Sequence, residues 1–152
     1  MTVHFRSLIR GIKTKQITAI ARAISVLENN SKPLLKRKLK KYLGGNKHSG
    51  FLIGVTGPAG SGKSTLIGAL ARVMRKEKKK VAIVAVDPTS PATGGAFLGD
   101  RIRMQELTED PGVFVRSMAS RGAHGGVAHA TKDVAKLFAK IGYDYKIGRA
   151  HV

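Results

Sequence analysis

The sequence contains no cysteine and no tryptophan, few acids, and no long apolar run. Without thiols, disulfides and cysteine-ligated metal sites are excluded, which fits a reducing compartment. No segment approaches the roughly 20 apolar residues that cross a bilayer, so no membrane span is predicted. What is present is a globular composition, 42% hydrophobic and 24% charged, over 152 residues. That is the length of one ordinary domain with a real core.

The scarcity of acids is uneven along the chain. Nine acids face 28 lysines and arginines, and residues 1–47 hold one glutamate against eight lysines and four arginines, about +11. Such a segment is either a surface for nucleic acid or an acidic partner, or a solvated helical face. It has neither an alternation of aromatic and basic residues nor a nucleic-acid motif, so the solvated face is favoured. A removable targeting leader is also conceivable within residues 5–24, which lack acids, but a helical pattern begins almost at once.

Periodicity separates a basic extension from a nucleotide domain. Apolar residues recur at helical spacing from Arg6 to Leu27, which predicts a helix. Ser31 as an N-cap and an early Pro33 predict a second helix to about Tyr42, ended by Gly44–Gly45. We therefore predict a helical extension over residues 1–47 and the start of a nucleotide domain over residues 48–146.

The nucleotide domain alternates strands and helices. Phe51–Val55 and Val81–Val86 are short apolar runs typical of buried parallel strands, and a helix is predicted between them over Lys63–Lys76. Further predicted elements follow the second strand: a helix at Phe97–Leu107, a strand at Gly112–Val115, a helix at Val127–Ala139 and the opening of a strand at Tyr143–Tyr145. This order predicts an α/β fold with a doubly wound, mostly parallel sheet.

A phosphate-binding loop lies between the first strand and its helix. Gly57-Pro58-Ala59-Gly60-Ser61-Gly62-Lys63-Ser64 matches G-x-x-x-x-G-K-[ST]. The glycines allow backbone N–H groups to converge on an anion, and the following helix adds its positive end. Lys63 is expected at the β- and γ-phosphates, Ser64 at Mg²⁺ and Thr65 at the α-phosphate. The residues predicted to bind nucleotide are Gly57, Gly60, Ser61, Gly62, Lys63, Ser64 and Thr65.

Two acids follow at positions suited to the same ligand. Asp87 ends the second strand at the carboxyl edge of the sheet, where it could hold Mg²⁺ or position water; the alternative is an ordinary Asp-Pro turn. Asp100 lies in a glycine-rich segment that could order around the γ-phosphate, or could have no role. The five histidines are too scattered for a metal cluster and are interpreted as non-ligands.

Several segments together are more specific than the loop. They are Gly54–Ile67, Ala85–Pro91, Gly94–Met104 and Arg116–Gly122 with Gly125–Gly126. In this order they resemble the MeaB/ArgK/MMAA family of P-loop GTPases, over about residues 6–145. His124 stands where an apolar residue is more usual in the family.

The resemblance implies a function and assigns residues to it. Members of the family hydrolyse GTP with Mg²⁺ and act as chaperones of cobalamin-dependent acyl-CoA mutases, chiefly methylmalonyl-CoA mutase. By this likeness Lys63, Asp87 and Asp100 are the catalytic residues, and Ser64, Asp87 and Asp100 are the metal ligands. A homodimer is expected for the full-length protein, in the cytoplasm or, in a eukaryote, in the mitochondrial matrix.

Other functions remain open at this point. A nickel-insertion GTPase shares the fold, but its usual cysteine and histidine clusters are missing here. A transport-associated ATPase or kinase, a role once attached to ArgK-like proteins, would need an ATP pocket or acceptor site. A nucleic-acid-binding module would rest on the basic extension alone.

The last residues depart from the family. After Tyr143–Asp144 the family continues through an apolar strand to an acidic motif, and later to an N-K-x-D motif that reads the base. Here Ile147–Val152 closes the chain, and it can be back-translated as ATC GGA AGA GCA CAC GTC, part of a common sequencing adapter. We expect residues 147–152 to be foreign to the natural protein, and the 152-residue chain to fold poorly and hydrolyse GTP weakly or not at all.

Overall fold

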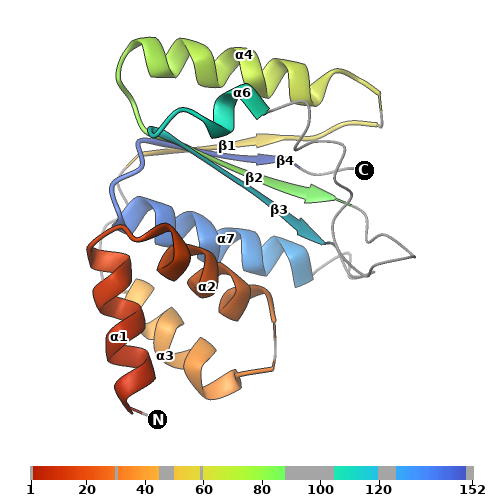
Figure 1. The fold of residues 1–152 in the computed structure, drawn as a ribbon. Coiled ribbons are helices and arrows are strands. Elements are labelled where there is room, and N and C mark those ends of the chain that lie inside the picture. Colours follow the sequence, from red (N-terminus) through yellow and green to blue (C-terminus); the bar gives the residue numbers. More distant parts are fainter. Residues whose placement is uncertain are drawn as a thin grey trace.

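The computed structural model describes residues 2–29, 31–44, 50–58, 60–87, 105–119 and 126–149. Within them the chain runs through helices and strands that alternate after an all-helical start (Figure 1). The elements are α1 (Thr2–Lys13), α2 (Ile17–Glu28), α3 (Pro33–Leu43), β1 (Phe51–Val55), α4 (Lys63–Lys76), β2 (Val81–Asp87), α6 (Gln105–Thr108), β3 (Val113–Ala119), α7 (Gly126–Lys140) and β4 (Tyr145–Arg149).

The four strands form one parallel sheet in the order β1-β4-β2-β3. Figure 1 shows α4 and α6 over one face, and α7 with the three N-terminal helices over the other. The last strand is therefore inserted between the strand before the phosphate loop and the second strand. This arrangement confirms the predicted α/β class with helices on both faces of a parallel sheet.

Burial differs sharply between the two strands that were expected to be buried. Every residue from Val81 to Val86 in β2 is buried, because β2 has a neighbour on each side and helices on both faces. In β1, however, Phe51 is 68% exposed and Leu52 58% exposed. The prediction of a buried first strand is wrong because, among the described residues, β1 pairs only with β4 and lies at the edge of the sheet.

The N-terminal extension contains three helices, so the prediction of one continuous helix from Arg6 to Leu27 is wrong. The chain leaves α1 at Thr14, whose hydroxyl donates to the carbonyl of Arg10 at 3.1 Å. Lys15 then takes a left-handed conformation with φ 57°, and Gln16 precedes α2. No glycine, proline or asparagine marks this break, which is why the periodicity runs across it.

The third helix begins as predicted, with a different cap. Pro33 occupies the first turn of α3, but the N-cap position is Lys32 rather than Ser31, and no side chain caps the helix. The end at Gly44 is as expected. Elsewhere, α4 has the predicted bounds and α7 contains the predicted helix, whereas β3 begins one residue after the predicted start at Gly112 and continues to Ala119. Of the predicted helix Phe97–Leu107, only the part in α6 lies within the described residues.

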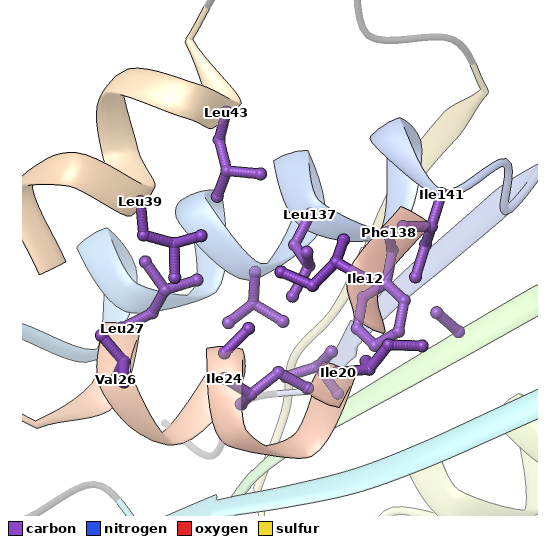
Figure 2. Packing of buried hydrophobic residues seen from close by; sticks show 14 of the residues in the cluster. Ile12, Ile20, Ile24, Val26, Leu27, Leu39, Leu43, Leu137, Phe138 and Ile141 are labelled. Carbon is purple, nitrogen blue, oxygen red and sulfur yellow. The ribbon is translucent and has the colours of Figure 1, made fainter. Parts of the chain in front are cut away.

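One apolar core joins the extension to the nucleotide domain. Side chains of α1, α2 and α3 interdigitate with those of α7 (Figure 2). The fully buried members include Ile12, Ile24, Leu27, Leu39, Leu43, Leu137 and Phe138. The same cluster reaches the sheet through Val84 and Met118. The helices of residues 1–47 thus cover the sheet face behind α7, and the predicted boundary at residue 47 does not coincide with a gap in the core.

Polar contacts hold the same junction. Lys40 of α3 pairs with Asp133 of α7 at 2.8 Å, and Arg116 of β3 contacts Glu28 of α2 at 3.3 Å. Lys140 donates to the carbonyl of Tyr42 and lies over its ring. A search of the described helices finds none that is both long and apolar enough to cross a membrane.

Candidate functional site

The phosphate loop leaves the carboxyl end of β1 and enters α4. Gly60 and Gly62 have φ values of 77° and 78°, a left-handed conformation that side-chain-bearing residues rarely adopt. Gly62 is the N-cap of α4, and its carbonyl accepts the first helical bond from Leu66 at 2.9 Å. The helix therefore begins directly at the loop, and its unpaired N–H groups and positive dipole end face the loop.

Lys63 is folded back over the loop. Its side chain is buried, and its Nζ donates to the carbonyl of Gly57 at 2.8 Å and to that of Pro58. The Ser61 hydroxyl also donates to the Pro58 carbonyl, at 2.9 Å. A buried ammonium is stable only when its donors are satisfied. Lys63 is held by carbonyls that an incoming phosphate oxygen can replace, so its charge is available to an anion in the loop.

Ser64 contacts a second cation that comes from the far end of the chain. Arg149, the last residue of β4, donates from Nη1 to the Ser64 hydroxyl at 2.6 Å and is 2% exposed. The register explains the approach, since Arg149 is paired with Val55 of β1 and Ala85 of β2 at the same carboxyl edge. Lys63 and Arg149 therefore give the site a positive charge on two sides.

The remaining predicted residues are placed only in part. Thr65 is exposed on the first turn of α4. The backbone of Asp87 ends β2 at the same sheet edge, opposite Ala119 of β3, while its carboxylate lies outside the described residues. Asp100 lies wholly outside them, as do the side chains of all five histidines. Within the described part, no group of three or more metal-ligating side chains is found.

A magnesium ion fits the described part of the site poorly. The Ser64 oxygen, predicted as its ligand, accepts a hydrogen bond from a guanidinium, whereas Mg²⁺ is usually held by one or two carboxylates together with substrate phosphates and water. The described residues supply no carboxylate there. The assignment of Ser64, Asp87 and Asp100 to a metal therefore stays a prediction.

Arg149 is the site residue that motif analysis does not find. It belongs to no phosphate-binding pattern, and it falls within the tail that we expect to be foreign. The signal that could have found it is topological. A strand inserted beside β1 must end next to the loop, and its last side chain on the α4 face then points to Ser64.

The arrangement can bind a polyanion. Loop N–H groups, the positive end of α4, and the cations of Lys63 and Arg149 converge at the carboxyl edge of a parallel sheet. This is the place where nucleotides bind to doubly wound sheets. The described residues include no element that reads a base.

The chain is similar to several proteins named as GTPases. The family described as methylmalonyl Co-A mutase-associated GTPase MeaB matches residues 14–148. A protein of Pyrococcus abyssi named as a candidate GTPase is 49% identical over 138 residues, covering 90% of this chain and 42% of that protein. The GTPase ArgK of Escherichia coli is 42% identical over 95 residues, covering 62% of this chain and 29% of that protein.

Two further matches extend the range of relatives. The mitochondrial methylmalonic aciduria type A homolog of Caenorhabditis elegans is 35% identical over 156 residues, covering 94% of this chain and 38% of that protein. A crystal structure of a LAO/AO transport system kinase matches with a TM-score of 0.75 at 24% identity, covering 99% of this chain and 44% of that chain. At this identity the match supports the fold alone. The chain spans about two fifths of the length of the first curated relatives it matches.

Proposed function

We propose that this chain, which belongs to the MeaB family of methylmalonyl-CoA mutase-associated GTPases, supplies the phosphate-binding part of a GTP-hydrolysing chaperone for a cobalamin-dependent acyl-CoA mutase. The observation that carries the proposal is the loop itself. Gly62 opens α4 in a left-handed conformation, and the buried Lys63 lies against loop carbonyls with its charge directed into the loop. This geometry supports triphosphate binding, and the family match favours GTP over ATP.

In the proposed reaction, the chain's own groups position the phosphates and neutralise their charge. Lys63 leaves the carbonyls of Gly57 and Pro58 and contacts the β- and γ-phosphates, where negative charge grows in the transition state. Asp87, at the end of β2, is proposed to position the attacking water, and Asp100 to respond to the γ-phosphate. In the family Mg²⁺ supplies charge neutralisation at these phosphates, and no step of this proposal depends on it.

The identity of the client enzyme is inferred from the family relationship. The family description names methylmalonyl-CoA mutase, and the Caenorhabditis elegans relative carries the name of methylmalonic aciduria type A. We propose that nucleotide-dependent ordering of the segments around Asp87 and Asp100 gates cobalamin delivery to the mutase and protects it. Dimerisation and location, in the cytoplasm or a mitochondrial matrix, are proposed on the same ground.

The test compares nucleotides and partner. The complete product of the gene is purified, and hydrolysis of GTP and of ATP is measured with and without methylmalonyl-CoA mutase. We expect GTP to be preferred and the mutase to stimulate turnover; equal use of both nucleotides with no stimulation would refute the proposal.

A matched pair of variants isolates the loop. Lys63→Met should weaken guanine nucleotide binding by at least about 100-fold, since a charge-assisted contact to phosphate is lost. Lys76→Met removes an exposed cation from the last turn of the same helix and should leave binding within about twofold. Equal effects of the two substitutions would show that general charge, and not the loop, holds the nucleotide.

A further inference from the structure

Residues of the three N-terminal helices enclose a hollow. Figure 1 shows these helices on the face of the sheet opposite α4, the helix that follows the phosphate loop. The volume of the hollow is about 420 Å³, within the range of small-molecule sites. It is lined by residues of α1, of α2, and of α3 with its N-cap: Phe5, Arg22, Lys32, Pro33, Leu34, Leu35 and Lys38.

The floor of this hollow is apolar for a structural reason. The side of α3 that faces the core carries Leu35, Leu39 and Leu43, whereas Leu34 lies outside this stripe and is 49% exposed. Leu34 does not complete the core shared with α7, and together with Phe5 of α1 it lines the hollow instead. An exposed leucine beside an aromatic ring in a concave site gains from covering by hydrocarbon.

The rim is cationic and lacks acids. Arg22, Lys32 and Lys38 surround the floor, and among the described residues none of the three makes an ion pair. Another cation of α3, Lys40, does have a partner, Asp133 of α7. The one acid of residues 1–47, Glu28, pairs with Arg116 of β3. The extension therefore contains no carboxylate of its own to neutralise this rim.

We propose that this hollow binds an amphipathic anion of the fatty-acid class, with the hydrocarbon chain on Leu34 and Phe5 and the carboxylate at Arg22 and Lys38. Charge complementarity selects an anion, and the apolar floor selects one with a hydrocarbon body. A nucleic-acid backbone matches the rim but leaves the floor uncovered, so it fits less well. The site is independent of the nucleotide and of the proposed chaperone function.

Calorimetric titration of the purified chain with hexanoate, octanoate and decanoate tests the floor. Because each buried CH₂ contributes a roughly constant amount, affinity should rise about threefold to fourfold per CH₂. Octanol and octylammonium, which share the chain but lack the negative charge, should bind at least about tenfold more weakly than octanoate. An affinity independent of chain length, or no saturable binding of decanoate, overturns the proposal.

Variants test the rim and the floor separately. The double substitution Arg22→Glu and Lys38→Glu should weaken decanoate binding at least about tenfold. Arg10→Glu with Lys13→Glu makes the same change in charge on exposed positions of α1 that do not line the hollow, and should change binding less than twofold. Leu34→Gln, at a half-exposed position, should flatten the dependence on chain length without lowering the melting temperature. Equal losses in both charge-reversal pairs would mean that the whole basic face attracts anions and would overturn the proposal.

Vesicles distinguish a free carboxylate from a lipid surface. Phosphatidylglycerol vesicles should bind the chain through its net charge of +19, in a salt-dependent way and without dependence on Leu34. Tight vesicle binding that Leu34→Gln abolishes, with no binding of free decanoate, would identify a membrane-docking face and refute the fatty-acid site.

Discussion

Replacing Arg149 by glutamate should make nucleotide binding depend on magnesium. In the structure, the Arg149 guanidinium lies 2.6 Å from the Ser64 hydroxyl and is buried, so it cannot be ignored as a solvated surface charge. Two unit charges 4 Å apart interact by about 4 kcal/mol at an effective dielectric constant of about 20, and a divalent ion doubles this to about 8 kcal/mol of repulsion. Even a quarter of that value, about 2 kcal/mol, is roughly a 30-fold penalty on ion binding.

The assay measures the affinity for a fluorescent guanine nucleotide with excess magnesium and with EDTA. For the unchanged chain, the affinity with excess magnesium should exceed the affinity in EDTA by less than about threefold. The reason is that Arg149 is expected to neutralise phosphate charge without the ion. Arg149→Glu should bind weakly in EDTA and recover with magnesium by at least about 30-fold, and Arg149→Met should lie between them. Lys76→Glu, an equal charge change on the exposed end of α4, should leave the ratio unaltered.

A strong magnesium requirement in the unchanged chain would refute this reasoning. It would mean that Arg149 swings away from Ser64 when nucleotide enters, so the hydrogen bond would have no bearing on the bound state. Resequencing the source locus decides the origin of residues 147–152: an uninterrupted reading frame that encodes them would contradict an adapter origin.

The described contacts support four further predictions. Gly62→Ala should destabilise the loop by about 1–2 kcal/mol and weaken nucleotide binding, because its φ is left-handed, while Gly54→Ala in β1 should not weaken binding. Burial lowers the pKa of Lys146 although the charge of Asp144 opposes the shift, so Lys146→Met should raise the free energy of unfolding at pH 7. Urea titrations should show that this gain shrinks as the pH rises towards about 10. Leu52→Lys on the exposed edge strand should reduce concentration-dependent self-association in sedimentation experiments, and an unchanged profile would exclude pairing through β1. Glu28→Gln should cost about 1–3 kcal/mol by leaving the half-buried Arg116 uncompensated, whereas replacing both partners with leucine should cost less.

Local signals account for the parts of the fold and site that sequence alone predicts. The glycines of the loop, Lys63 and the α4 pattern lie within twenty residues of one another, and their geometry follows from backbone requirements and helix capping. The run Val81–Val86 is apolar throughout because both faces of β2 are covered, and such a run is visible without knowing its neighbours.

Strand order accounts for what sequence alone does not predict. The exposure of Phe51 depends on which strand lies beside β1, and the contact of Arg149 with Ser64 spans 85 residues. No periodicity contains this information, since a run of five apolar residues looks the same in the centre and at the edge of a sheet. The turn at Lys15 was not predicted for a different reason. Lys15 has a left-handed backbone conformation, which lysine rarely adopts, so the residue type does not indicate a break between helices.

The cations of the N-terminal extension lie in different surroundings in the structure. One of them holds the extension to the nucleotide domain: Lys40 pairs with Asp133 beside a core that contains Leu39 and Phe138. A helix docked this way keeps its cations on the outer side, because any cation turned inward would need a carboxylate of its own. Three others, Arg22, Lys32 and Lys38, lie where α1, α2 and α3 meet, around the apolar floor of the hollow. Beside its solvated cations, the extension therefore has one that joins it to the nucleotide domain and three that surround the concave site proposed to bind an anion.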